Sequence, residues 1–217
     1  KILVQRKKRI RPGLDDKVLC SWNAIMLNSY VDAYKAFNEN SFLIQAINSA
    51  NFICSKMMEK DFRLNRNYKN GRASINAFLD DYAFTIDGFI ALYQSTFDEN
   101  WLTLALQITE YVFTHFYDKQ SGMFYYTSAI DPALIARKME INDNVIPASN
   151  SVMAKNLFQL GHYFYDDNYL KLARQMLLNV KDDIKKSGTY YSNWGILLNS
   201  FVYSPFEIAI CGKDAID

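Results

Sequence analysis

The 217-residue chain has few of the residues that build disulfide scaffolds, metal sites or histidine-based active sites. Its three cysteines, Cys20, Cys54 and Cys211, form neither a CxxC pair nor a metal-ligand spacing. We therefore expect reduced thiols, no metal ion and no other cofactor, and the thiols favour a cytoplasmic location. His115 and His162, the only histidines, both fall near the ends of predicted helices, where a dipole contact is the plain interpretation.

Proline, glycine, long apolar runs and excess charge are also scarce. Four prolines and eight glycines are too few for a disordered chain, and no apolar run approaches the ~18 residues of a membrane span. A net charge of +1 argues against nucleic-acid or membrane partners, and we interpret the basic run at residues 6–11 as a solvated or locally paired segment. The first ten residues have no initiator Met and no signal-peptide core, so we expect a longer protein around this chain.

The chain is rich in apolar residues, at 50%, and in aromatic residues, at 15%, and these recur at helical spacing. The pattern predicts an all-α protein of antiparallel helical hairpins with short β-hairpins in its long loops. The predicted helix pairs cover about 24–37 and 41–60, 80–97 and 99–117, and 149–165 and 168–186, followed by a shorter helix near 193–203.

The predicted hairpins are repeats. A shift of 59 residues aligns Tyr34 with Tyr93 and Ala46 with Ala105, and a further shift of 68 carries Ala105 to Ala173. The turns within the pairs are nearly constant, since they read NENSF, DENWL and DDNYL. One such hairpin cannot bury both of its faces, so we expect the repeats to stack.

The connections between pairs, about 61–79 and 118–148, are much longer than the turns within them. Turn residues beside extended stretches, at Asn65–Gly71 and Ser121–Tyr126, predict small β excursions. Both connections enter the N-terminal end of the first helix of a pair, so they gather on one rim with helix N-termini that favour polar or anionic partners. A further buried strand is expected within Tyr203–Gly212.

Three helix openings occupy equivalent places on this predicted rim: Trp22-Asn23, Asp81-Tyr82 and Ser149-Asn150. Ordinary capping by Ser21, Asp80 and Ser149 is one interpretation. Recognition of a ligand by the same positions is the other.

If the rim binds a carbohydrate, two carboxylates across a cleft are the expected catalytic groups, and Asp16 and Asp81 are the candidate pair. The candidate substrate contacts are the neighbouring charged residues, aromatic rings that suit a sugar face and polar groups that suit hydroxyls: Asp15, Lys17, Trp22, Asn23, Asp80, Tyr82, Ser149 and Asn150. Asp87, further along its helix, is interpreted as structural.

An ordered series of short motifs resembles one family. The series is Arg11-Pro12, Asp15-Asp16-Lys17, Trp22-Asn23, Leu79-Asp80-Asp81-Tyr82-Ala83-Phe84 and Pro147-Ala148-Ser149-Asn150-Ser151. It is similar to the spermatogenesis-associated, thioredoxin-like family and its bacterial relatives. The resemblance implies an (α/α)6 toroid of the six-hairpin glycosidase and N-acylglucosamine 2-epimerase type, preceded by a thioredoxin-like domain that would be a partner within the same full-length chain.

This chain departs from that pattern in two respects. It holds about three and a half predicted hairpins rather than six, and it has no histidine at the helix starts, where the epimerase relatives have acid–base groups. The resemblance places residues 1–204 in part of the toroid and residues 205–217 at the start of a truncated β-containing extension.

Two functions remain open from the sequence. The first is a carbohydrate-binding or carbohydrate-processing domain, inactive as this fragment alone. The alternative is a non-catalytic helical scaffold that binds a partner or positions the thioredoxin-like domain. An open arc of hairpins exposes apolar helix faces, so a homodimer of the fragment is also expected.

Overall fold

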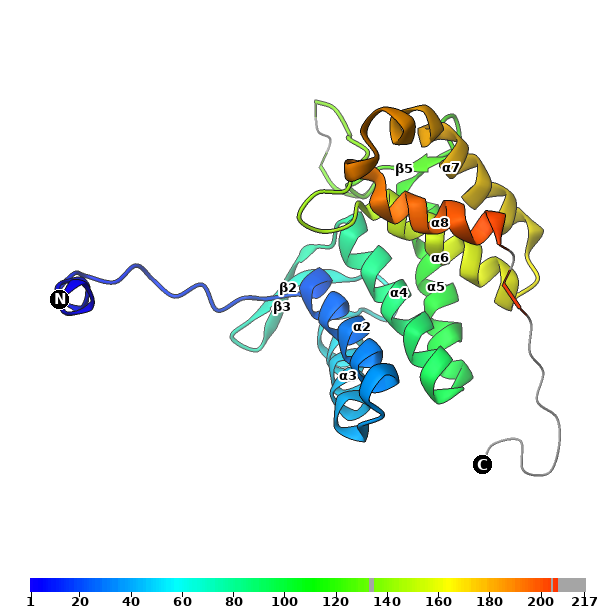
Figure 1. Cartoon of the computed structure of the whole chain (residues 1–217). Coiled ribbons are helices and arrows are strands. Elements are labelled where there is room, and N and C mark those ends of the chain that lie inside the picture. Colours follow the sequence, from blue (N-terminus) through cyan, green and yellow to red (C-terminus); the bar gives the residue numbers. More distant parts are fainter. Residues whose placement is uncertain (133–134, 204, 207–217) are drawn as a thin grey trace, which may run out of the picture.

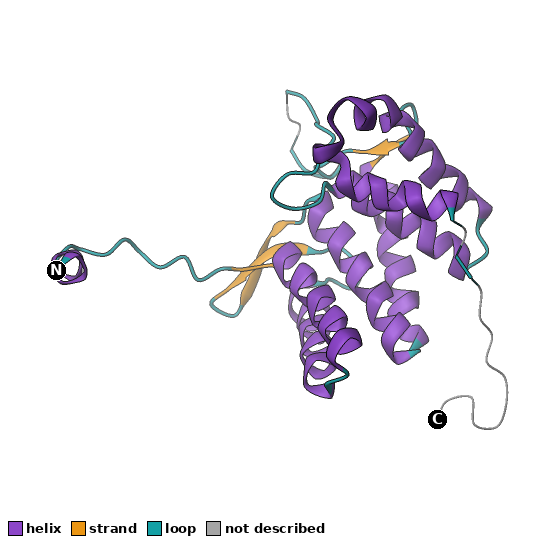
Figure 2. Cartoon of the chain, in the orientation of Figure 1, coloured by secondary structure: helices purple, strands orange, loops and turns teal. Residues whose placement is uncertain are grey.

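The computed structural model describes residues 1–132, 135–203 and 205–206. Within these residues three helical hairpins follow one another, as the sequence predicts, and one further helix comes after them (Figures 1 and 2). Their helices are α2 (Cys20–Phe37) with α3 (Asn40–Phe52), α4 (Leu79–Thr96) with α5 (Glu99–Phe116), α6 (Ser149–Tyr163) with α7 (Asp167–Ser187), and then α8 (Ser192–Val202). A π-helical turn, Ile53–Met57, extends α3, and a 3-10 turn, Gly188–Tyr191, links α7 to α8.

The helices form two layers in an open arc. The first helices of the hairpins lie side by side in the order α2, α4, α6 and then α8, and each outer helix, α3, α5 or α7, packs on its own partner. Figure 1 shows the blue, green and yellow-orange hairpins in this succession, with α2 at one end of the inner layer and α8 at the other. The all-α hairpin prediction is therefore confirmed.

The turns within the hairpins share one backbone geometry. Asn38, Phe97 and Tyr165 each follow an inner helix with φ values of 54°, 55° and 53°, which is the left-handed conformation that ends a helix. In the second and third turns Asp98 and Asp166 then cap the outer helix, because each carboxylate accepts a hydrogen bond from the backbone N–H two residues later. The constant turn motif therefore encodes a constant reversal.

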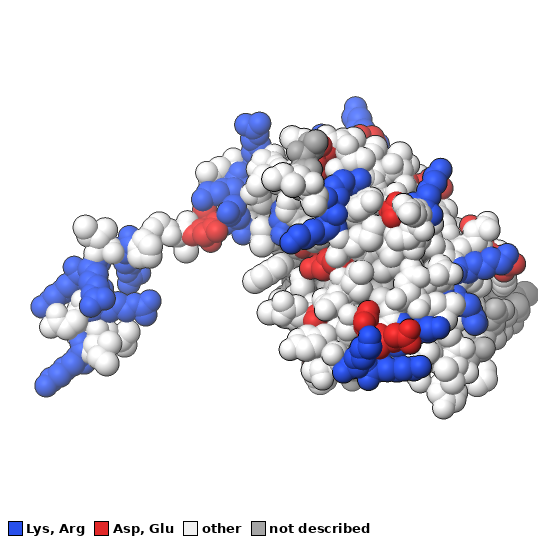
Figure 3. Space-filling view, turned by 90° about the horizontal axis from the view of Figure 1, so that it is seen from above, with Lys and Arg blue, Asp and Glu red and all other residues white. Residues whose placement is uncertain are grey.

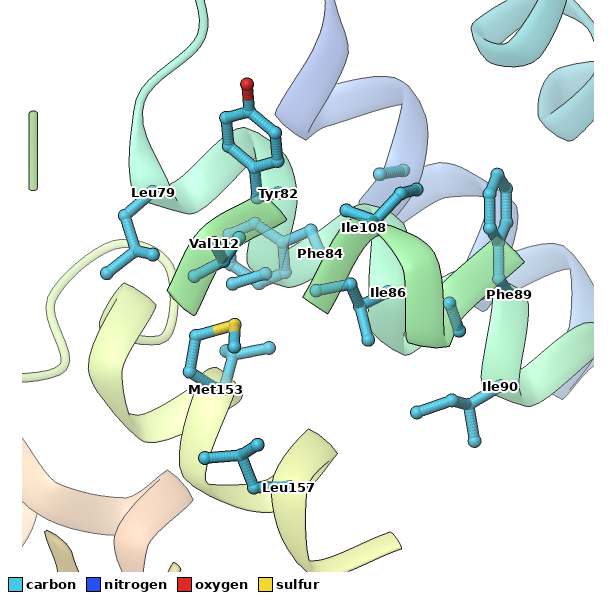
Figure 4. Packing of buried hydrophobic residues seen from close by; sticks show 14 of the residues in the cluster. Leu79, Tyr82, Phe84, Ile86, Phe89, Ile90, Ile108, Val112, Met153 and Leu157 are labelled. Atoms are coloured by element: carbon cyan, nitrogen blue, oxygen red, sulfur yellow. The ribbon is translucent and has the colours of Figure 1, made fainter. Parts of the chain in front are cut away.

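Helix α4 forms the centre of the core. Its residues are buried from Leu79 to Leu92 with the exception of Asp87, because α2, α5 and α6 cover three of its sides. Figure 4 shows the α4 side chains Phe84 and Ile86 packed between α5 and α6 residues such as Val112 and Met153. At about 1.5–3 kcal/mol for each fully buried large apolar side chain, this contact dominates the stability of the arc.

Two small antiparallel sheets occupy the long connections. The strands β1 (Val18–Leu19), β2 (Asn65–Lys69) and β3 (Arg72–Asn76) form one sheet in that order, and β4 (Tyr117–Asp118) pairs with β5 (Met123–Phe124) in the other. Both predicted β excursions are confirmed. The strand predicted within 203–212 lies almost entirely outside the described residues.

The N-terminal segment carries the helix α1 (Ile2–Lys7), which the sequence analysis did not predict and which has no buried residue. In Figure 1 this segment extends away from the helical body. No helix in the described part of the chain has the length and hydropathy to cross a membrane.

Alanine substitutions at two glycines, one in α6 and one in α8, test how closely α6 packs on α7. A Cβ atom on Gly161 of α6 would lie 2.8 Å from Leu170 of α7, whereas a Cβ on Gly195 of α8 meets nothing within 4 Å. We expect Gly161→Ala to lower the free energy of unfolding by about 1–3 kcal/mol through overpacking. Gly195→Ala should raise it by up to about 1 kcal/mol through helix propensity. Urea unfolding of both variants measures the difference, and equal shifts would contradict the close approach of α6 to α7.

Candidate functional site

The rim at the N-termini of the inner helices is built around the buried carboxylate of Asp81. This carboxylate accepts a hydrogen bond from the backbone N–H of Ser21 at 2.9 Å and another from that of Phe78 at 3.0 Å. It therefore caps α2 and α4 at once, although it belongs to α4 alone. Arg66 of β2 donates to Asp81 at 2.9 Å and to Asp80 at 3.1 Å, which completes a partly desolvated cluster of three charges.

The electrostatics of this cluster follow from its burial. Desolvation raises the pKa of Asp81 above its ordinary value, and the neighbouring Asp80 acts in the same direction. Arg66 and the two backbone N–H groups oppose that rise, because they stabilise the carboxylate. All of these donors are protein groups, so Asp81 acts as a structural link between two helices.

The predicted N-caps of the inner helices are wrong by one or two residues. The residues that precede α2, α4 and α6 are Leu19, Phe78 and Ala148, and none of them provides a side-chain cap. At the start of α4 the acceptor is local, since Asp81 accepts from Phe78 three residues before it. The starts of α2 and α8 instead use carboxylates that are 60 and 50 residues away in the sequence, an arrangement that local pattern does not encode.

The third and fourth inner helices repeat this device with different residues. Asp143, in the long connection, accepts hydrogen bonds from Ala148 N–H at 2.9 Å and from Asn193 N–H at 2.8 Å, so it links α6 to α8. Glu140 accepts one from the backbone N–H of Ser149 at 3.0 Å. The Asn150 side chain bonds to both the N–H and the C=O of Phe124 at 2.9 Å, which fixes β5 against α6.

The two residues of the predicted catalytic pair, Asp16 and Asp81, contact different side chains in the structure. Asp16 lies at the surface, where an ion pair with Lys69 lowers its pKa, while Asp81 is fully enclosed in the capping cluster. Asp15 pairs with Lys17 at 3.4 Å, also at the surface. The expectation that Asp16 and Asp81 face one cavity does not match this arrangement.

The other predicted contact residues are dispersed in the same way. Trp22 is 65% exposed, and the Asn23 side chain donates to the carbonyl of Leu19 at 2.7 Å. Tyr82 is fully buried, its ring stacks on Tyr111, and its hydroxyl accepts a hydrogen bond from the backbone of Leu64 at 2.9 Å. Asp80, Ser149 and Asn150 are held inside the rim by the contacts given above.

The side chains that the fold does bring together lie on the inner face of the arc. Asn28 of α2 donates to Asp87 of α4 at 2.7 Å. Lys155 of α6 donates to Asn193 at 3.3 Å, and its charge opposes the rise that burial causes in the pKa of Asp87. Asn28, Asp87 and Lys155 occupy one position of the repeat, because the shift of 59 carries Asn28 to Asp87 and the shift of 68 carries Asp87 to Lys155. A single structural position thus presents an amide, a carboxylate and an ammonium group to one surface.

Two adjoining hollows surround this trio, and together they form what we call the inner groove. The first, of about 280 Å³, lies at the rim end and adds Ile25, Phe84 and the 145–147 loop to its lining. The second, of about 230 Å³, lies further along the helices and is lined mainly by polar groups: Asn28, Asp32, Lys35, Asp87, Gln94, Lys155 and Gln159. Hydrogen bonds from Lys35 to Gln94 at 3.3 Å and from Gln94 to Gln159 at 3.5 Å cross its floor.

Asp87 is the carboxylate whose ionisation the inner groove alters most clearly. Burial raises the pKa of Asp87 above its ordinary value, while Lys155 and the hydrogen bond from Asn28 limit the rise. Such a group holds its proton to a higher pH than an ordinary aspartic acid, which suits a general acid. The sequence analysis interpreted Asp87 as structural. The signal that could have identified it is the polar residue at the same repeat position in α2, α4 and α6.

The charges of the body are mixed in sign. In Figure 3 basic and acidic side chains lie among each other over the helical body, whereas the basic residues of the N-terminal segment gather at its far end. Within the described residues no cluster of three or more His, Cys, Asp or Glu side chains is arranged to hold a metal ion.

Similarity to known proteins agrees with this architecture. No family profile matches the chain. The chain is 30% identical over 222 aligned residues to human spermatogenesis-associated protein 20 and 29% identical to the mouse protein. Each alignment covers 98% of this chain, which spans only about 28% of the length of these relatives.

Solved structures with a similar fold include enzymes that are named for their sugar substrates. A GH76 α-mannanase of Bacteroides thetaiotaomicron has a TM-score of 0.63 at 19% identity, over 79% of this chain and 47% of the enzyme. Cellobiose 2-epimerase of Bacillus thermoamylovorans has a TM-score of 0.63 at 12% identity, over 77% of this chain and 45% of the enzyme. The hairpins therefore form part of an (α/α)6 toroid, as the sequence predicts.

The distinction between a capping carboxylate and an exposed one is directly testable. Asp81→Ala leaves the N-termini of α2 and α4 without this acceptor and leaves Arg66 paired with Asp80 alone, so we expect a loss of about 3–5 kcal/mol in the free energy of unfolding. Asp16→Asn removes only a solvent-screened ion pair and should change stability little. Denaturant titration of the two variants checks this, and a stable Asp81→Ala protein would show that the cluster is not structural.

Proposed function

We propose that this chain forms the carbohydrate-binding wall of a sugar-processing toroid and that the ligand lies in the inner groove. Nearly the whole of this chain aligns with spermatogenesis-associated protein 20. The observation that carries the proposal is the polar trio Asn28, Asp87 and Lys155, which one repeat position directs to the concave face. The fold shared with sugar enzymes supports it.

The groove offers the groups that a sugar requires. Hydroxyls both donate and accept hydrogen bonds, and the amides of Gln94 and Gln159 do the same beside charged donors and acceptors. The apolar 145–147 loop at the rim end, where Val145 is exposed, suits the apolar face of a pyranose. Asp87 is the proposed general acid in a complete toroid, and the opposite wall would come from hairpins beyond this chain.

If the chain is instead a non-catalytic scaffold, the same face should have a different surface composition. A partner-binding concave surface is expected to be a contiguous apolar patch. The lining of the second hollow of the inner groove contains one apolar side chain, Ala91, among amides and charged groups. The inner face therefore favours a small polar ligand over a protein partner.

Three further expectations stay predictions. They are the thioredoxin-like domain as a neighbour within the full-length chain, a cytoplasmic location, and the inactivity of this chain when it is alone. The first follows from the resemblance, the second from the reduced thiols, and the third from the missing wall of the groove.

Sugar binding by this chain is tested with mannobiose, cellobiose and glucose 6-phosphate in calorimetric or NMR titrations. Asp87→Asn keeps the size of the side chain but removes its charge, and we expect it to weaken binding about tenfold or more, as loss of a charged hydrogen bond does. Asp182→Asn, on the exposed side of α7, is the matched control and should bind as the parent does.

The outcome also separates the groove from the rim. Loss of binding in a folded Asp81→Asn protein, with normal binding by Asp87→Asn, would restore the rim carboxylates as the sugar site. Absence of binding by any of the three probes would favour the scaffold.

The exposed side of α2 is the surface through which we expect two copies of this chain to associate. Trp22 and Met26 lie one helical turn apart on α2 and are 65% and 51% exposed. We expect the chain to form a dimer whose concentration dependence is weakened by Trp22→Glu. Light scattering across a concentration series measures this, and a monomer at every concentration contradicts it.

A further inference from the structure

A second hollow lies on the outer surface, away from the inner groove. It has a volume of about 510 Å³ and lies between the outer helices α5 and α7. We call it the aromatic shelf and define it by its lining: Glu110, Phe113, Tyr117, Asn168, Tyr169 and Leu172. None of these residues takes part in the rim or in the inner groove, so neither the capping clusters nor the proposed sugar site explains it.

Three aromatic rings on the shelf are held in fixed orientations. Phe113 and Tyr169 are nearly parallel, with an interplanar angle of 6° and ring centroids 5.6 Å apart. Tyr117 meets Phe113 edge to face at 5.2 Å, and behind them lies the fully buried ring of Phe124. Because the rings stabilise one another, their partly exposed surfaces form a rigid platform rather than loose side chains.

The one charged side chain among the described lining residues of the shelf is acidic. The face of each ring carries the negative part of the aromatic quadrupole. The exposed carboxylate of Glu110 lies on the lining, and Asp166 lies close by at the start of α7. Burial raises the pKa of Tyr169 to about 12, and both carboxylates add to that rise, which indicates that they act on the same place.

We propose that the aromatic shelf binds an organic cation, of the quaternary ammonium or protonated amine class, over the rings of Phe113 and Tyr169 with Glu110 as its counter-ion. Aromatic faces attract such cations within about 6 Å, and a carboxylate at the edge of the ring cluster adds to the attraction. A neutral sugar would use the same rings but gain nothing from the excess of negative charge. The charge therefore selects the cation.

The test compares two ligands of one shape. Choline is the probe, and 3,3-dimethyl-1-butanol, in which carbon replaces the charged nitrogen, is its neutral counterpart. In NMR titrations of this chain we expect choline to shift the signals of Tyr169 and its neighbours and to bind at least about threefold more tightly than the neutral alcohol. Excess sodium chloride should weaken choline binding alone.

Two variants and a control define the site. Glu110→Gln should lower choline affinity by about threefold without changing binding of the alcohol, and Tyr169→Leu should weaken both ligands. Glu99→Gln, in the first turn of the same helix, is the matched control and should leave both affinities unchanged. Equal affinity for the two ligands, or no response of Tyr169 to either, would overturn the proposal. Tighter binding of cellobiose than of choline at the shelf would assign it to sugars instead.

Discussion

The arc depends on how the N-termini of its inner helices are satisfied. Four backbone N–H groups at each helix start have no partner within the helix, and here the starts lie together at one rim. The carboxylate of Asp81 accepts hydrogen bonds from backbone N–H groups at the starts of α2 and α4, and that of Asp143 accepts them at the starts of α6 and α8. Each acid therefore joins two successive inner helices, which fixes their relative height and angle. The hydrophobic contacts of α4 then stabilise an arrangement that these hydrogen bonds have aligned.

This use of the rim has a consequence for ligand recognition. A carboxylate that is enclosed by two backbone donors and an arginine is not available to a substrate, and the backbone N–H of Ser149 and the side chain of Asn150 are occupied in the same way. The polar side chains left to meet a ligand lie further along the helices, on the concave face. There the repeat places Asn28, Asp87 and Lys155 in register, and the three chemical types at this one position give an asymmetric surface.

On the outer face of the arc, the aromatic shelf is built mainly from aromatic packing rather than from polar groups. Each outer helix packs mainly on its own inner partner, and rings that pack on one another lie between α5 and α7. The inner groove combines amides with both signs of charge, whereas the shelf combines aromatic faces with carboxylates. The two surfaces therefore suit different ligand chemistries, although they are built from the same hairpins.

The hairpins could be predicted from the sequence, because helical periodicity and the constant turn motif are local properties. The repeats could be predicted as well, since the shifts of 59 and 68 residues are visible without coordinates, whereas the toroid class came from the resemblance of the short motifs to a known family. The role of each acidic residue, in contrast, depends on the tertiary structure. Asp81 and Asp87 lie six residues apart on one helix, yet the first is sealed by Ser21 and Arg66 and the second opens to a groove. What separates them is which neighbouring element covers each side of α4, and that is set by contacts between residues about 60 positions apart, which no local pattern contains.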